Sequence, residues 1–155
     1  MSDMLRELMA RELVSARLGE AVLWTDDLAA NATPPQQTHL WLLQLLLPDL
    51  VAALERVIVE PGQNRHRVRR LAGGLLTYVY NPLDLVGDDM PFGHLDDTMI
   101  CALGLLRLRE RDHIELSAGV LAICTLVEGA LPLLASDLQS AIRAFVRDLE
   151  QGTMP

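Results

Sequence analysis

Apolar side chains recur every three or four positions along most of this chain, which is the spacing of one face of an α-helix. The pattern predicts a first helix over 3–30, which ends before a pair of prolines at 34–35. It predicts a second helical segment over 35–60, with a kink or break at Pro48, because proline removes a helical hydrogen bond. Residues 40–47 are apolar nearly all round, which predicts burial on most sides of this segment.

The same spacing predicts four further helices, over 64–80, 96–110, 113–130 and 136–150. The helix over 113–130 is the most apolar, so we expect it to be the most buried, and Asp112 and Glu115 suggest a capping box at its start. Ser136 is the expected cap of the last helix, and Gly152 is its stop signal.

No segment shows the alternation typical of strands, so the predicted fold class is all-α. We expect residues 1–155 to form a single compact bundle of about six helices. Helices 64–80 and 96–110 are joined by an acidic loop of about fifteen residues, so we expect them to form a central helical hairpin. The arginines of both helices then lie together at the end of the hairpin opposite the loop.

The stretch over 80–97 is strongly acidic, with five Asp residues and no basic side chain except His94. Asp96 and Asp97 precede an apolar helical run, so either suits an N-cap, and Asp84 suits a turn that bonds backbone N–H groups. The alternative is a divalent cation, which would relieve repulsion between neighbouring carboxylates. Its ligands would be Asp84, Asp88, Asp96 and Asp97, with His94 as a nitrogen ligand. Capping is the preferred interpretation.

Arginines crowd the first two turns of the predicted helix over 64–80, at Arg65, Arg67, Arg69 and Arg70. Such a patch can bind phosphate or nucleic acid, or it can be a solvated helix face paired with Glu60, Glu110 or Asp112. No aromatic side chain interleaves with the arginines, which weakens the case for single-stranded nucleic acid. We treat the four arginines as a candidate interaction patch.

The net charge of the chain disfavours some kinds of binding partner. The formal net charge is −8, and nucleic acid and anionic lipid both require a positive face. The charge therefore disfavours nucleic acid and, less strongly, a membrane surface, and it leaves a protein as the favoured partner, with self-association open. Half of the residues are apolar, which excludes an intrinsically disordered chain.

The two cysteines, Cys101 and Cys124, both lie in apolar helical surroundings, so we expect two buried free thiols, although the sequence alone allows a disulfide. The N-terminal residues lack the basic region and apolar core of a signal peptide. The uncharged run over 116–127 is shorter than the roughly 20 residues that span a bilayer. We therefore expect a cytoplasmic protein.

The acidic stretch resembles the core of the YkvA-like family, small bacterial proteins of unknown function. The resemblance covers about 66–109, and the matching residues are Pro82, Asp84, Leu85, Asp88, Pro91, Gly93, Leu95, Asp96 and Asp97. Gly87 stands where the family usually has a second proline, and Asp89 stands where it usually has an apolar residue. The resemblance implies a helical region around an acidic loop and an occasional association with membranes, and it implies no activity.

Catalytic motifs are missing from the sequence: Ser117, Ser136 and Ser140 lack a nucleophile motif, and no Gly-rich phosphate loop appears. We therefore expect a non-enzymatic helical interaction or scaffold protein without a cofactor. One alternative is a metal-dependent enzyme or metal-binding protein that uses the Asp-rich loop, and another is a peripheral membrane-associated protein. An enzyme needs a pocket beside the Asp cluster, a scaffold needs an exposed apolar patch, and a membrane protein needs that patch ringed by arginines.

Overall fold

The computed structural model describes residues 31–60, 65–80 and 94–152. Within these ranges it contains α2 (Pro34–Leu43), α3 (Leu47–Val59), α4 (Arg65–Val79), α5 (Leu95–Asp112), α6 (Ala118–Ala130) and α7 (Ser136–Gln151), with short 3-10 helices η2 (Gln44–Leu46) and η3 (Leu131–Leu133). The described residues include no strand, so the prediction of an all-α fold is confirmed. The predicted helix over 3–30 and the acidic residues 81–93 lie outside the described ranges.

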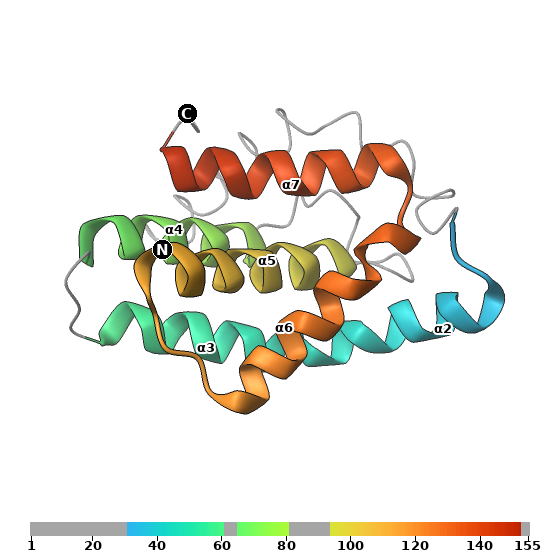
Figure 1. Ribbon diagram of the computed structural model, residues 1–155, viewed down its shortest axis with the longest axis horizontal. Helices are drawn as coiled ribbons and strands as arrows, with labels where there is room; N and C mark the ends of the chain where they lie inside the picture. The colour runs from blue at the N-terminus through green and yellow to red at the C-terminus, as the bar shows by residue number, and fades with distance from the viewer. Residues whose placement is uncertain (1–30, 61–64, 81–93, 153–155) are drawn as a thin grey trace.

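Helix α5 lies at the centre of the described helices and contacts α2, α3, α4, α6 and α7 (Figure 1). Thirteen of its 18 residues are buried, whereas only Cys124, Val127 and Ala130 are buried among the 13 residues of α6. The prediction that the helix over 113–130 is the most buried is therefore wrong. The physical reason is position: α6 packs mainly on α5 and leaves its outer side to solvent, whereas α5 has neighbours on several sides.

Helices α4 and α5 pack side by side and run in opposite directions. At one end, Tyr78 of α4 donates a hydrogen bond to Asp96 of α5, and at the other end Arg67 pairs with Asp112. Gly104 permits the close approach between them, because a Cβ at this position would collide with the side chain of Leu75. The arginines of α4 and α5 consequently share one end of the described bundle.

The break predicted at Pro48 is confirmed, since η2 separates α2 from α3 and Pro48 lies in the first turn of α3. Position 48 suits proline there, because the first N–H groups of a helix have no partner within it. At the start of α2, Thr33 and Gln36 form a reciprocal capping box.

The predicted caps of the last two helices are wrong. Helix α5 runs through Asp112 and ends where His113 adopts the left-handed conformation, at φ 56°, so Asp112 and Glu115 form no capping box. The α6 cap is instead Ser117, whose hydroxyl accepts a hydrogen bond from the N–H of Val120. Ser136 is the first residue of α7 rather than its cap.

The predicted stop at Gly152 is confirmed. Gly152 follows α7 in the left-handed conformation, at φ 71°, which costs glycine little because it has no Cβ.

Among the described residues the core is mainly aliphatic, and the rings of Tyr78 and Phe145 pack with their centroids 4.8 Å apart. Cys101 and Cys124 are buried thiols and form no disulfide with each other, as expected from their apolar surroundings. Burial is the main reason that the pKa of the Cys124 thiol rises to about 12, with the nearby Glu128 charge adding to it. Within the described residues, every helix falls short of the length and apolar character that crossing a bilayer requires.

Candidate functional site

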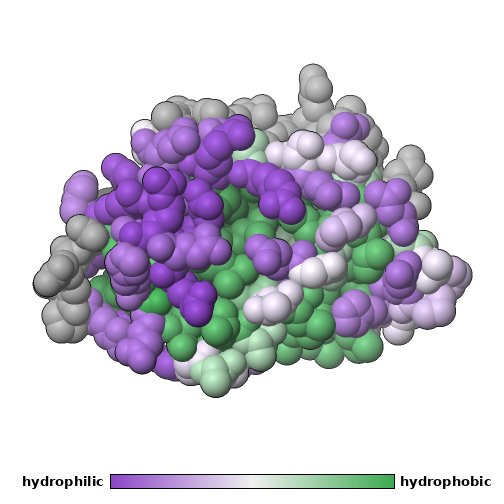
Figure 2. All heavy atoms as spheres, viewed as in Figure 1, coloured by the Kyte–Doolittle hydropathy of each residue, from purple (hydrophilic) through white to green (hydrophobic). Residues whose placement is uncertain are grey.

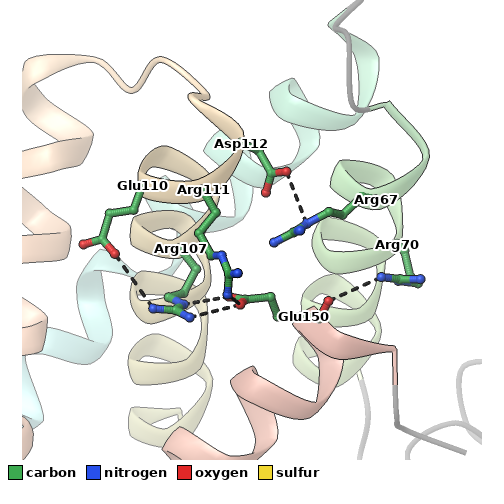
Figure 3. Close-up of polar contacts among 7 residues, drawn as sticks. All are labelled: Arg67, Arg70, Arg107, Glu110, Arg111, Asp112 and Glu150. Carbon is green, nitrogen blue, oxygen red and sulfur yellow. Dashed lines mark hydrogen bonds and ion pairs between the residues drawn. The ribbon is translucent and has the colours of Figure 1, made fainter.

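Charged side chains from three helices meet at the end where α4 begins and where α5 and α7 finish (Figure 3). We call this set the charged end; its members are Arg67, Arg70, Arg107, Glu110, Arg111, Asp112 and Glu150. Arg67 and Arg70 come from the first turns of α4, whereas Arg107 to Asp112 come from the last turns of α5. Basic residues near the end of α5 also suit the negative end of its helix dipole.

Glu150 lies at the centre of the charged end and is only 4 % exposed. Arg107 donates to both carboxylate oxygens, from Nε to Oε2 at 2.6 Å and from Nη2 to Oε1 at 3.0 Å, and Arg111 donates to Oε1 as well. The hydrogen bonds from Arg107 lower the pKa of Glu150 despite its burial, and the same bonds raise the pKa of Arg107. Two guanidinium groups thus replace the water that a buried carboxylate has lost.

The candidate arginine patch divides into paired and exposed members. Arg67 Nε lies 3.2 Å from Oδ1 of Asp112, whose side chain is buried, so the expected pairing with Asp112 is confirmed. Arg70 donates to the backbone carbonyl of Glu150 at 3.3 Å, near the negative end of α7. Arg69 is exposed, and Arg65 begins α4 with a side chain outside the described set.

The opposite end of α5 holds the acidic residues for which capping was predicted. His94 is the N-cap, and Asp96 and Asp97 lie inside the first turn, 1 % and 0 % exposed. The prediction that Asp96 or Asp97 caps this helix is therefore wrong, because the chain enters the helix at Leu95, one residue earlier than the pattern suggested. Both carboxylates still lie at the positive end of the helix dipole.

These buried acids take part in a polar network with neighbouring elements. Tyr78 donates to Oδ2 of Asp96 at 2.5 Å, and Nδ1 of His94 lies 3.4 Å from Oδ2 of Asp97. The backbone N–H of His94 donates to Oε1 of Gln44 at 2.8 Å, which ties η2 to the start of α5. The network links three separate segments of the chain.

The predicted metal ligands are only partly within the described residues. Asp97 and His94 lie in contact, Asp96 bonds Tyr78, and Asp84 and Asp88 lie outside the described ranges. Among the residues that the structure describes, no three His, Cys, Asp or Glu side chains converge as metal ligands would.

Apolar side chains are also exposed on the outer face of α2 and η2. Trp41, Leu42 and Leu45 are 48 %, 46 % and 65 % exposed, and we call them the outer strip. At about 100° per residue, the three lie within roughly 100° of arc, whereas Leu40 and Leu43 on the opposite side are buried. The prediction that residues 40–47 are buried on most sides is therefore wrong, and this segment has two apolar faces of which only one meets the core.

A cleft of about 260 Å³ lies between α5, α6 and α7. Its floor consists of Leu103, Leu106 and Val146, which the packing of α5 and α7 leaves at the edge of the core. Its rim is charged, and Arg107 connects the cleft to the charged end.

The sequence pattern did not single out Glu150 or Tyr78. Glu150 stands four residues after the buried Val146, so a carboxylate occupies the next position of the apolar stripe of α7. A charged residue at a core position is the feature of the sequence that could have indicated this buried carboxylate. Tyr78 similarly continues the buried stripe of α4 at Leu71 and Leu75, where a hydroxyl needs a partner. Both signals indicate a buried polar group without naming its partner.

Comparison of the chain with protein-family models, with curated proteins and with solved structures gives no match.

Proposed function

We propose that this chain is a non-enzymatic helical interaction protein that docks a partner protein on the outer strip. The observation that carries the proposal is the exposure of Trp41, Leu42 and Leu45 side by side on one helical face. Single exposed apolar residues are ordinary on protein surfaces, but a large aromatic and two leucines within about one turn form a contiguous patch. Trp is also among the residues that contribute most to binding at protein interfaces.

Charge favours a protein over an anionic membrane as the occupant. Residues 31–55, which carry the strip, contain no Arg, and the chain contains no Lys. A peripheral membrane site usually combines an apolar face with basic residues that attract anionic lipid. Figure 2 shows apolar residues over the middle and lower part of one face, with hydrophilic residues at the end where α4 begins.

We also infer the overall arrangement of the helices. The chain forms a bundle of about six helices in which α4 and α5 are a central hairpin joined by the acidic residues 81–93. Support comes from the opposite directions of α4 and α5 and from the contacts at both of their ends. We also propose that the protein belongs to the YkvA-like family, on the motif at residues 82–97, and that it is cytoplasmic.

Site-specific photocrosslinking in the native cell tests the docking surface. A photoreactive amino acid replaces Leu45, the most exposed member of the strip, and a control probe replaces Ser140, which is exposed on α7. We expect a discrete protein adduct at position 45, identified by mass spectrometry, and much less at position 140. The same adduct should disappear when Trp41→Arg is added, because a charge in the strip opposes desolvation.

Two outcomes would overturn this function. Equal labelling at positions 45 and 140 would show that the strip is ordinary surface. Adducts with lipid at position 45 would favour the peripheral membrane alternative. An adduct with a second copy of the chain supports the proposal and makes the partner this protein itself.

A metal-dependent role at the start of α5 is the second candidate. The observation in its favour is that Asp96 and Asp97 are both buried in adjacent positions, where two charged carboxylates repel each other. A divalent cation held with residues of the acidic segment would relieve that repulsion. Comparison of the Tm of the full chain with and without EDTA tests this candidate.

A further inference from the structure

The cleft between α5, α6 and α7 has walls of opposite charge. Helix α7 contributes Arg143 and Arg147, one turn apart, and α6 contributes Glu128. Helix α5 contributes one group of each sign, Arg107 and Glu110, beside the apolar floor. A ligand lying across this cleft would meet a mainly cationic wall, an acidic wall and an apolar surface between them.

Arg107 is fixed in position before any ligand arrives. Its Nε and Nη2 atoms donate to Glu150, and its Nη1 atom lies 3.9 Å from Oε2 of Glu110, beyond hydrogen-bond range (Figure 3). One face of the guanidinium fork is therefore held by a buried carboxylate, while Nη1 keeps hydrogen-bonding capacity. A group held in this way loses little conformational entropy when it binds an anion.

The other rim charges have few partners among the described residues. Arg143 and Glu128 make no ion pair with another described residue, and Arg147 approaches only the adjacent Asp148, at 4.0 Å. Charges that already neutralise each other across the cleft would leave nothing for a ligand to bind. Here both signs are available on different helices, and they line the same cleft as Leu103, Leu106 and Val146.

We propose that this cleft binds a small zwitterion with an apolar body, the chemistry of an α-amino acid with an aliphatic side chain. The carboxylate lies against Arg143 and Arg147, with Nη1 of Arg107 as a further donor. The ammonium lies against Glu128, and the aliphatic part covers the leucine and valine floor. A carboxylate accepts charge-assisted hydrogen bonds from guanidinium groups, and an ammonium donates them to carboxylates. The cleft volume of about 260 Å³ suits a ligand smaller than a drug-sized molecule.

Isothermal titration calorimetry of the full chain tests this assignment with leucine and three molecules that each lack one of its chemical groups. Leucine has the carboxylate, the ammonium and the aliphatic body. 4-Methylpentanoate lacks the ammonium, 3-methylbutylamine lacks the carboxylate, and glycine lacks the aliphatic body. We expect leucine to bind with a dissociation constant on the order of 1 mM, and each of the other probes to bind about tenfold more weakly or worse.

Single substitutions test which protein side chain binds which charged group of the ligand. Arg143→Gln should weaken leucine and 4-methylpentanoate and leave 3-methylbutylamine unchanged, whereas Glu128→Gln should weaken leucine and 3-methylbutylamine. Arg109→Gln is the matched control, because Arg109 is exposed on α5 and does not line the cleft. All three substitutions are at exposed positions, so circular dichroism should show unchanged helix content.

The proposal fails if leucine gives no saturable heat at tens of millimolar, or if Arg109→Gln weakens it as much as Arg143→Gln does. It also fails if 4-methylpentanoate binds as tightly as leucine, because the cleft would then recognise an anion rather than a zwitterion. Leucine-selective binding that both cleft variants weaken supports it, whatever the outer strip binds.

Discussion

Glu150 carries its charge in a place where only 4 % of the residue is exposed, and this single side chain joins two helices. Arg107 and Arg111 approach it from α5, while Arg70 of α4 bonds the backbone carbonyl of the same residue. An ion pair in a core seldom adds net stability over an apolar contact, but removing one partner leaves the other charge poorly solvated. Glu150 is therefore a residue where a small change should have a large effect.

Glu150→Gln should lower the free energy of unfolding at pH 7 by about 2–4 kcal/mol, below the full loss of a buried charge because both guanidinium groups are partly exposed. Urea denaturation measures the loss. Glu110→Gln is the matched control, since its carboxylate lies 3.9 Å from the same Arg107 but is 59 % exposed. The control should change the free energy by less than about 0.5 kcal/mol. Equal losses in the two variants would contradict a special role for Glu150.

The contribution of Glu150 should also depend on pH. Its folded-state pKa is lowered by the hydrogen bonds from Arg107, so its stabilisation is present above the unfolded pKa and is lost as pH falls through the folded pKa. The glutamine variant does not titrate at this position. The difference in unfolding free energy between wild type and variant should therefore be constant from pH 7 to about pH 5 and shrink below about pH 4.3. A difference that grows on acidification would show the opposite sign of the shift.

Tyr78→Phe should cost about 1–3 kcal/mol, because it removes the hydroxyl that donates to the buried carboxylate of Asp96 at 2.5 Å. Tyr80→Phe is a matched control two residues later, where the hydroxyl donates to Glu55 at 3.3 Å on the surface. The control should be nearly neutral. Urea denaturation of both variants measures the difference, and similar small losses would indicate that the Tyr78 hydrogen bond adds little.

At the scale of elements, the helices show why composition alone misjudges burial. Helix α6 is very apolar and yet lies on the outside, whereas α5 carries charges at both ends and is buried over most of its length. The number of neighbouring helices decides burial, and a stripe in one helix does not report how many neighbours it has. We therefore expect α5 to open only with the whole fold.

Amide hydrogen exchange should be slowest in the middle of α5, around Cys101 to Leu105, and clearly faster in α6 around Val120 to Ile123. Exchange from a core helix requires global unfolding, whereas a helix with one solvent-exposed side can open locally. Mass spectrometry of peptic fragments after labelling measures both segments in one sample. Slower exchange in α6 than in α5 would contradict the arrangement of the two helices.

Much of the fold was predictable from spacing, and the failures have local causes. The helices of the described ranges follow their apolar stripes, and Pro48 and Gly152 mark a break and an end as expected. Helix starts were less predictable, because Asp96 and Ser136 fit a cap equally well one position outside the first turn or within it.

The candidate site was less predictable than the fold. Arg67 could be paired with Asp112 because both were expected at one end of a helix pair. Glu150 could not be paired with its partners from the sequence, because Arg107 and Arg111 are about forty residues away and contact it only through the packing of α7 on α5. The cleft likewise depends on three helices, and no single stripe encodes it.

At the scale of the whole molecule, acids offset three of the four arginine charges at the charged end. The chain carries a net charge of −8, and four of its arginines lie beside Glu110, Asp112 and Glu150. An end whose charges are paired in this way offers no strong field to a polyanion such as nucleic acid. The outer strip lies on a different part of the chain, with no Arg from residue 31 to residue 55. The surface thus separates an apolar contact from a polar end that holds helices together.

The buried acids at the start of α5 either stabilise the fold through hydrogen bonds or hold a cation. Melting of the full chain with and without a chelator distinguishes the two roles. Asp96 and Asp97 have contacts within the protein, from Tyr78 and His94, so we expect melting curves with and without EDTA to give the same Tm. A cation present at a hundred times its dissociation constant adds about 2.7 kcal/mol, which for a chain of this size corresponds to roughly 5–10 °C in Tm. Asp97→Asn should be milder than Asp97→Ala if hydrogen bonding matters most, and the two should be equally damaging if a metal is bound. A fall of several degrees with EDTA that Mg²⁺ or Ca²⁺ restores would overturn the structural role and make the acidic segment, with Asp84 and Asp88, part of a metal site.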